Sequence, residues 1–153
     1  MPLRGRMGTF PLRLDRYFFT ETVVRANPGH APTGPRDGSL IVPSLSCSPI
    51  EGREDAFALE LTVTLDESKS ENPPYFFSIN AFAILVAAPD LPCEAALPMA
   101  QTTGFNMLVG AIREHLASIT ARGPWGPFLF GPMTYQQTAA LNQIPASEDS
   151  PDC

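Results

Sequence analysis

The sequence predicts an α+β domain in which a four-stranded antiparallel sheet is followed by a long helix and then a short helix. Several segments of the first 86 residues alternate apolar with polar side chains, which is the period of half-buried strands. Around residue 110 the apolar residues instead recur every three or four positions, as in an amphipathic helix. Strands that precede helices along the chain favour an antiparallel α+β arrangement.

The first two strands are predicted at residues 10–25 and 40–42, and Leu45 is a candidate extension of the second strand beyond Pro43. The earlier segment alternates from Phe10 onward, and both of its faces become aromatic at residues 17–19, which indicates a β-bulge or a second buried face. The turn-rich connection ANPGHAPTGPRDGS separates the two segments. Prolines follow the second segment closely, so we expect an edge or irregular strand there.

The next two strands, at residues 57–66 and 75–86, have the clearest patterns. The connection ESKSENPP between them is typical of a solvated hairpin loop. The later strand is nearly as apolar on one face as on the other. We therefore expect both of its faces to be covered, either within the subunit or between subunits.

A long helix is predicted at residues 102–122. Thr102 or Thr103 is a suitable N-cap, and the Arg-Gly-Pro sequence at 122–124 is suited to end the helix, with glycine in a left-handed conformation. The apolar stripe of this helix comprises Phe105, Leu108, Ile112, Leu116 and Ile119.

A short helix is predicted at residues 135–143, with Thr134 as its cap. The single domain then spans residues 10–143, between a flexible N-terminus at 1–9 and an acidic, disordered tail at 144–153.

Composition restricts the classes of function. The 153 residues suffice for one domain, and their charged fraction of 17% lies well below the roughly 25% usual for soluble domains. With 44% hydrophobic residues, the chain is expected to cover part of its surface by self-association or by binding a partner, and we expect an oligomer by default. The net charge of −6, without a basic stripe, argues against nucleic acid and disfavours membrane surfaces as partners.

The cysteines at 47, 93 and 153 lie far apart and lack the spacing of a metal site. A reduced compartment fits them best, and no signal peptide or membrane span is recognisable. We therefore expect a cytoplasmic protein that is not inserted in a membrane and needs no cofactor or metal.

No catalytic constellation is apparent. Glycine-rich phosphate loops and the motifs HExxH, CxxC and GxSxG are all absent from the sequence. His30 is expected to be a solvated loop residue, and His115, at the border of the helix stripe, to lie at the rim of an interface. Glu60 and Asp66 are expected on a solvated strand face. The sequence therefore does not predict an enzyme.

Residues 122–135, RGPWGPFLFGPMTY, combine a backbone rich in glycine and proline with strongly apolar side chains. We call them the crossover segment. Glycine and proline exclude a helix and interrupt strands, whereas irregular segments normally lie at the surface and are polar. The segment must therefore either wedge into a core or line a groove for an apolar partner. Met133 would give such a groove a flexible, polarizable side chain.

The stretches AFALELTVTLDES and PYFFSINAFAILVAA, together with the span 104–135 and its Arg-Gly junction, resemble the SecB family of bacterial export chaperones. The resemblance covers residues 10–143. It implies a four-stranded antiparallel sheet with two helices, assembled as a dimer of dimers in which the long helices lie between two sheets. Such an assembly would also cover the doubly apolar strand.

The resemblance further implies an ATP-independent chaperone that holds unfolded precursors in apolar grooves and delivers them to the SecA motor. By position, the residues implied to contact client polypeptides are Trp125, Phe128, Phe130, Met133, Tyr135 and Leu141. SecB-like chaperones also protect antitoxins of toxin–antitoxin systems, and this chain could do so. The alternative is a small-ligand-binding or purely structural oligomer whose loop aromatics are buried.

The family's acidic SecA-docking surface is only partly matched. Glu21 corresponds to one of its carboxylates, but Arg25 and Ile79 stand where two other acidic residues would be expected. The comparison therefore favours client holding over SecA docking.

Overall fold

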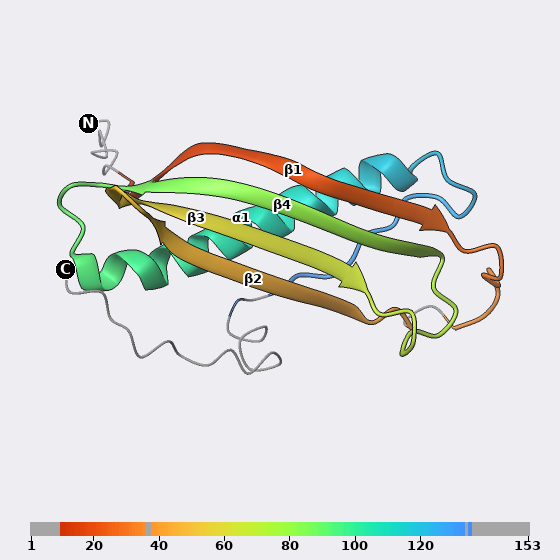
Figure 1. The fold of residues 1–153 in the computed structure, drawn as a ribbon. Helices are drawn as coiled ribbons and strands as arrows, with labels where there is room; N and C mark the ends of the chain where they lie inside the picture. Colours follow the sequence, from red (N-terminus) through yellow and green to blue (C-terminus); the bar gives the residue numbers. More distant parts are fainter. Residues whose placement is uncertain (1–9, 36–37, 134, 136–153) are drawn as a thin grey trace, which may run out of the picture.

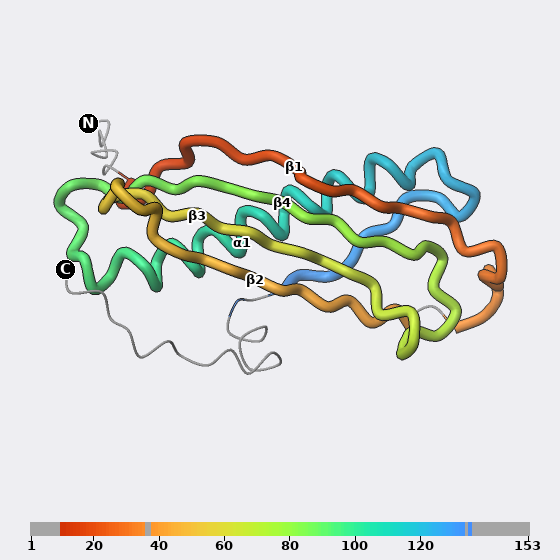
Figure 2. The backbone as a smooth tube through the Cα atoms, in the orientation of Figure 1, coloured from red at the N-terminus to blue at the C-terminus, as the bar shows by residue number. Residues whose placement is uncertain are grey.

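The computed structural model describes residues 10–35, 38–133 and 135, which form one sheet with a long helix on one side (Figures 1 and 2). The strands are β1 (Leu12–Ala26), β2 (Ile41–Ile50), β3 (Arg53–Leu65) and β4 (Tyr75–Ala87), and the helix is α1 (Cys93–Thr120). The strand order is β1-β4-β3-β2, and every neighbouring pair is antiparallel. The predicted fold class and the number of strands are confirmed. Apart from Tyr135, the short helix predicted at 135–143 and the acidic tail lie outside the described residues.

The edge strands differ most from the prediction. In β1, the register shifts between Leu14 and Arg16 and again between Phe19 and Glu21, so the predicted bulge is present and a second one precedes it. Strand β2 continues past Leu45, the last residue of the predicted extension, and pairs with β3 from Ile41 to Ile50. Its prolines are tolerated because β2 is the last strand of the described sheet and pairs with β3 on one side.

The core lies between α1 and the inward faces of β3 and β4. Every second residue of β4 from Tyr75 to Leu85 is buried on this side. Phe105, Leu108, Ile112 and Leu116 of α1 are fully buried against them. Gly104 permits the close approach of helix and sheet, because a Cβ atom there would overlap the side chain of Leu59.

Helix α1 begins nine residues before the predicted start. It starts at Cys93 after Pro92, with Glu94 in the first turn, so Thr102 and Thr103 are interior residues and the predicted caps are wrong. Thr102 instead donates its hydroxyl to the carbonyl of Pro98 at 3.1 Å. The predicted start was too late because Pro98 lies inside the helix. An interior proline removes one main-chain hydrogen bond, so its presence argues against a helix at that point of a sequence.

The end of α1 corrects two further expectations. Ile119 is 41% exposed and does not belong to the buried stripe, which continues from Leu116 to Thr120. Gly123 does not have the positive φ expected of a helix-ending glycine. It is required for another reason: a Cβ atom at this position would collide with the hydroxyl of Tyr75.

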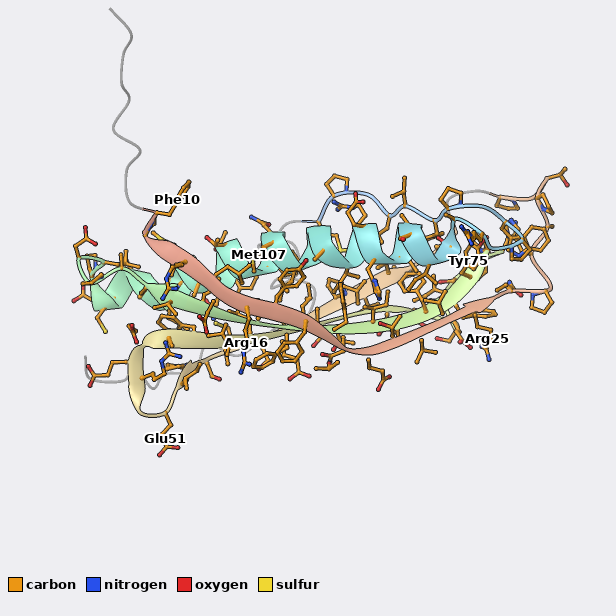
Figure 3. All side chains as sticks on the ribbon, turned by 90° about the horizontal axis from the view of Figure 1, so that it is seen from above. Phe10, Arg16, Arg25, Glu51, Tyr75 and Met107 are labelled. Carbon is orange, nitrogen blue, oxygen red and sulfur yellow. The ribbon has the colours of Figure 1, made fainter. Side chains whose placement is uncertain are left out.

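The opposite face of the sheet is not covered by any element in the described part of the chain (Figure 3). The rings of Phe18 and Phe82 meet there with centroids 5.2 Å apart, and the Arg25 guanidinium lies 4.9 Å from the centroid of Phe76. Among the described residues, an element covers β4 on one face, and coverage of the other face by a second subunit stays a prediction. None of the described helices combines the length and apolar character needed to cross a membrane.

Candidate client-binding groove

The crossover segment returns from the end of α1 on the helix side of the sheet (Figures 1 and 3). Its side chains alternate in direction. Phe130 is 6% exposed and belongs to the core, whereas Leu129 is 63% exposed. Phe128 is half-buried, with its ring centroid 5.5 Å from that of Phe77. The segment therefore both wedges into the core and presents an apolar surface, so the two possibilities derived from the sequence occur together.

The remaining implied contact residues occupy intermediate positions. Met133 and Tyr135 pack against the core while remaining half-buried, and the ring centroid of Tyr135 lies 5.9 Å from that of Phe105. Trp125 is half-buried at the start of the segment. Leu141 lies outside the described residues. The structure thus brings Trp125 and Phe128 to one groove and assigns Phe130 to the core.

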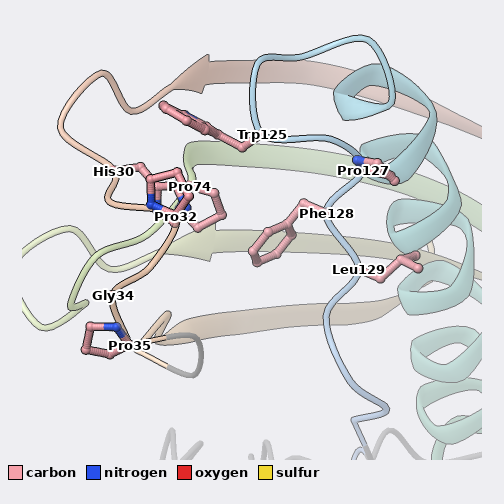
Figure 4. A pocket seen from close by; sticks show the side chains of 9 residues that line it. All are labelled: His30, Pro32, Gly34, Pro35, Pro74, Trp125, Pro127, Phe128 and Leu129. Atoms are coloured by element: carbon pink, nitrogen blue, oxygen red, sulfur yellow. The ribbon is translucent and has the colours of Figure 1, made fainter.

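The groove has a volume of about 380 Å³ and lies between the crossover segment and the connection that joins β1 to β2 (Figure 4). Trp125 and Phe128 extend from the crossover segment toward the side where Pro32 of the β1–β2 connection lies, together with Pro74, which directly precedes β4. The residues that line the groove are His30, Pro32, Gly34, Pro35, Pro74, Trp125, Pro127, Phe128 and Leu129. Four prolines and two aromatic side chains give it stiff walls, since proline fixes its own φ.

Trp125 joins the two walls. Its indole N–H donates to the main-chain carbonyl of Asn27 at 3.0 Å. Its ring also meets that of His30 edge-on, with centroids 4.9 Å apart. His30 is half-buried, so the expectation of a solvated loop residue is wrong. Sequence reasoning missed this role because the contact partner of His30 lies 95 positions further along the chain.

Asn72 fixes the wall formed by the β1–β2 connection, and it was not singled out from the sequence. Its side-chain oxygen accepts the N–H of Ala31 at 2.7 Å, and its amide donates to the carbonyls of Ala31 at 2.9 Å and Pro35 at 3.1 Å. Its main-chain carbonyl lies 2.9 Å from Nδ1 of His30. Asn72 has a φ of 51°, a left-handed conformation that asparagine adopts more readily than most residues. The sequence signal was an asparagine directly before two prolines.

The lining of the groove carries few polar side chains. Its lining residues include no aspartate, glutamate, lysine or arginine, and His30 is the one titratable side chain among them. The described residues contain no group of three or more His, Cys, Asp or Glu side chains that could hold a metal ion. His115 lies away from these lining residues, stacked on Phe19 at 4.0 Å with Nε2 3.1 Å from the Thr22 hydroxyl.

The three residues compared with the SecA-docking surface do not lie on one exposed surface, because two are exposed and Ile79 is buried. Glu21 is exposed on β1, and Arg25 is exposed and forms an ion pair with Glu67 at 3.2 Å. Ile79 is fully buried under α1, so it does not belong to an outward surface. Its neighbours Ser78 and Asn80 point outward and carry no charge. Strand β4 itself therefore carries no carboxylate at this point, but the Glu60 carboxylate on the neighbouring strand β3 accepts the side-chain amide of Asn80 at 2.8 Å.

Comparison with solved structures shows which known fold the chain has. The chain superposes on the Mycobacterium tuberculosis SecB-like chaperone Rv1957, solved in complex with a ChAD peptide from the Rv1956 HigA1 antitoxin, with a TM-score of 0.57. The match covers 81% of this chain and 91% of that chain at 16% sequence identity. A Streptococcus agalactiae protein of unknown function gives a TM-score of 0.46 at 7% identity, covering 80% of this chain and 97% of that one. No family model and no curated protein matches the sequence. The chain therefore has a SecB-like fold.

Proposed function

We propose that this protein is an ATP-independent holdase that binds non-native polypeptides in the groove between the crossover segment and the β1–β2 connection. The observation that carries the proposal is the alternation within the crossover segment. Phe130 anchors the segment in the core, while Leu129, Phe128 and Trp125 line an uncharged groove. Burying a client's apolar side chains there gains roughly 25 cal/mol per Å² of apolar surface and makes little demand on client sequence.

An aggregation assay tests this proposal. A chemically unfolded model protein is diluted into buffer with the purified chain, without nucleotide, and light scattering is followed. Suppression at about stoichiometric amounts supports the holdase, because each groove would remove apolar segments from the pool that associates. Aggregation that proceeds unchanged at several-fold excess contradicts it. It would favour the alternative of a purely structural or small-ligand-binding protein.

A role as dedicated chaperone of an antitoxin is the second candidate. It is favoured by the superposed mycobacterial structure, in which a SecB-like chaperone holds an antitoxin peptide. Arg25 and the buried Ile79, at two positions where the resemblance would place acidic docking residues, favour it further over delivery to SecA. A titration with SecA separates the candidates: submicromolar affinity would establish export delivery, whereas its absence together with tight binding of one antitoxin peptide would establish the dedicated role.

We also propose that the working form is a cytoplasmic homotetramer, arranged as a dimer of dimers. The support is the uncovered sheet face, on which the aromatic rings of Phe18, Phe76 and Phe82 lie partly exposed. Light scattering should give a mass near four times 16.5 kDa. A monomer mass would contradict this assembly without affecting the groove itself.

A further inference from the structure

Two buried hydroxyl groups, those of Tyr75 and Thr120, lie beside the start of the crossover segment and form hydrogen bonds with its main chain. Tyr75 is the first residue of β4 and is 2% exposed, and Thr120 is the last residue of α1 and is 1% exposed. Thr120 occupies the position where the apolar stripe of α1 would continue after Leu116. Burying a hydroxyl there is unfavourable unless it is hydrogen-bonded.

The Tyr75 hydroxyl binds both sides of the turn that follows α1. It accepts the main-chain N–H of Trp125 at 3.1 Å and lies 2.8 Å from the carbonyl of Gly126, the nearer of two possible acceptors for its single proton. The carbonyl of Thr120 is the other, at 3.3 Å. Gly126 has a φ of 76°, so the turn depends on this glycine as well.

The Thr120 hydroxyl binds the next part of the segment. It accepts the main-chain N–H of Phe128 at 2.8 Å and donates to the carbonyl of Leu116 at 2.7 Å. Valine has nearly the same shape but cannot make either bond. The hydroxyls of Tyr75 and Thr120 therefore satisfy the N–H groups of Trp125 and Phe128, the two residues whose rings form one wall of the groove.

The packing around Tyr75 leaves little space for another arrangement. Gly123 lies so close that a Cβ atom would collide with the tyrosine hydroxyl, and the Phe128 ring meets the Tyr75 ring edge-on at 6.5 Å. Because both hydroxyls are buried, water does not readily replace these bonds when one of them breaks.

We infer that the hydroxyls of Tyr75 and Thr120 form a two-point latch that holds the crossover segment in the shape of the groove. They are positioning groups: they do not line the groove themselves but fix the backbone of Trp125 and Phe128, which do. The consequence for client affinity rests on the proposed function. The latch itself is a property of the chain without client.

Hydrogen exchange and fluorescence test the latch without a client. Trp125 is the one tryptophan of the chain, so its emission reports this segment. In Tyr75→Phe, the Trp125 amide should exchange about fivefold faster, the factor expected for one lost hydrogen bond, and the emission should shift to the red. Tyr17→Phe is the matched control, since Tyr17 lies nine residues along β1 from Ala26, the residue paired with Tyr75.

Two variants of Thr120 distinguish the effect of the hydroxyl group from the effect of the shape of the side chain. They remain informative if Tyr75→Phe does not fold. Thr120→Val should accelerate exchange of the Phe128 amide about fivefold, whereas Thr120→Ser, which keeps the hydroxyl, should restore slow exchange. Equal exchange in the valine and serine variants would overturn the latch. So would protected Trp125 and Phe128 amides in a folded Tyr75→Phe.

Client binding is then measured with a reduced and carboxymethylated lysozyme, which stays unfolded, carrying a fluorescent label. We expect Tyr75→Phe and Thr120→Val to weaken its binding about fivefold, and Tyr17→Phe and Thr120→Ser to bind as the wild type does. Loosened amides with unchanged affinity would overturn the link between latch and groove. If the wild type itself does not bind, the proposed function fails, and the exchange data still decide the latch.

Discussion

The indole N–H of Trp125 donates to the main-chain carbonyl of Asn27 at 3.0 Å, across 98 positions of the sequence. The bond connects the crossover segment, which follows α1, to the β1–β2 connection, which begins directly after the end of β1. The groove therefore has two walls that are held at a fixed separation before any client arrives. Preformed walls reduce the conformational entropy lost on binding.

Trp125→Phe should test this connection. Phenylalanine keeps an aromatic ring near His30 but cannot donate to Asn27, so we expect the free energy of unfolding to fall by about 1 kcal/mol, the net contribution of one hydrogen bond. Urea unfolding followed by circular dichroism measures it. A variant as stable as the wild type would show that the bond does not hold the walls together.

Leu129 and Phe130 are neighbours with opposite expected effects. Phe130→Ala should destabilise the protein by about 3 kcal/mol or more, because it removes a large side chain from the core. Leu129→Ser, at a side chain that is largely exposed, should leave the unfolding midpoint nearly unchanged and weaken binding of an unfolded client. Urea unfolding and a client titration measure both. A Leu129→Ser variant that binds client as well as the wild type would exclude Leu129 from the binding surface.

Gly104 and Gly110 provide a matched pair within α1. A Cβ atom at Gly104 would overlap Leu59, so Gly104→Ala should cost about 1–3 kcal/mol of stability. At Gly110 a Cβ atom meets nothing within 4 Å, and alanine should stabilise the helix by up to about 1 kcal/mol. Thermal unfolding midpoints should move in opposite directions. If both variants were destabilised alike, the difference in packing between the two glycines would be refuted.

Cys47 should react slowly with thiol reagents. Burial of its side chain against the core raises the pKa of the thiol to about 11 from 9.0, because desolvation disfavours the thiolate. At pH 8 the thiolate fraction should be about 100-fold smaller than for an ordinary cysteine, and alkylation slower by a similar factor. The rate should increase with pH up to about 11. Peptide mass mapping of Cys47 after timed alkylation measures it, with urea-unfolded protein as control.

Much of the fold followed from the sequence because periodicity reports burial directly. Burial alternates from Phe57 to Leu65 in β3 and from Tyr75 to Ala83 in β4, and the predicted bounds of both strands differ from the observed ones by a few residues at most. The first part of α1 did not follow, because Pro98 interrupts the helical pattern and the buried residues there are small alanines. Local signals are weak where tertiary packing supplies the stability.

The groove was predicted in part. The crossover segment stood out because its apolar side chains conflict with its backbone composition. The opposite wall did not stand out, since the roles of His30 and Asn72 depend on contacts made across the fold. Thr120 was also missed: a threonine at the end of a helix resembles a surface residue until its burial is known. Only the three-dimensional arrangement shows that its hydroxyl binds Phe128.

The central claim is that the groove beside Trp125 holds non-native polypeptide, and the single tryptophan allows a direct measurement. A reduced, carboxymethylated polypeptide that contains no tryptophan is titrated into the protein while Trp125 emission and its quenching by acrylamide are recorded. The account predicts a saturable blue shift with reduced quenching, and neither change with the same polypeptide in its native, disulfide-bonded form. Binding detected by anisotropy of a labelled client, with Trp125 emission and quenching unchanged, would contradict it.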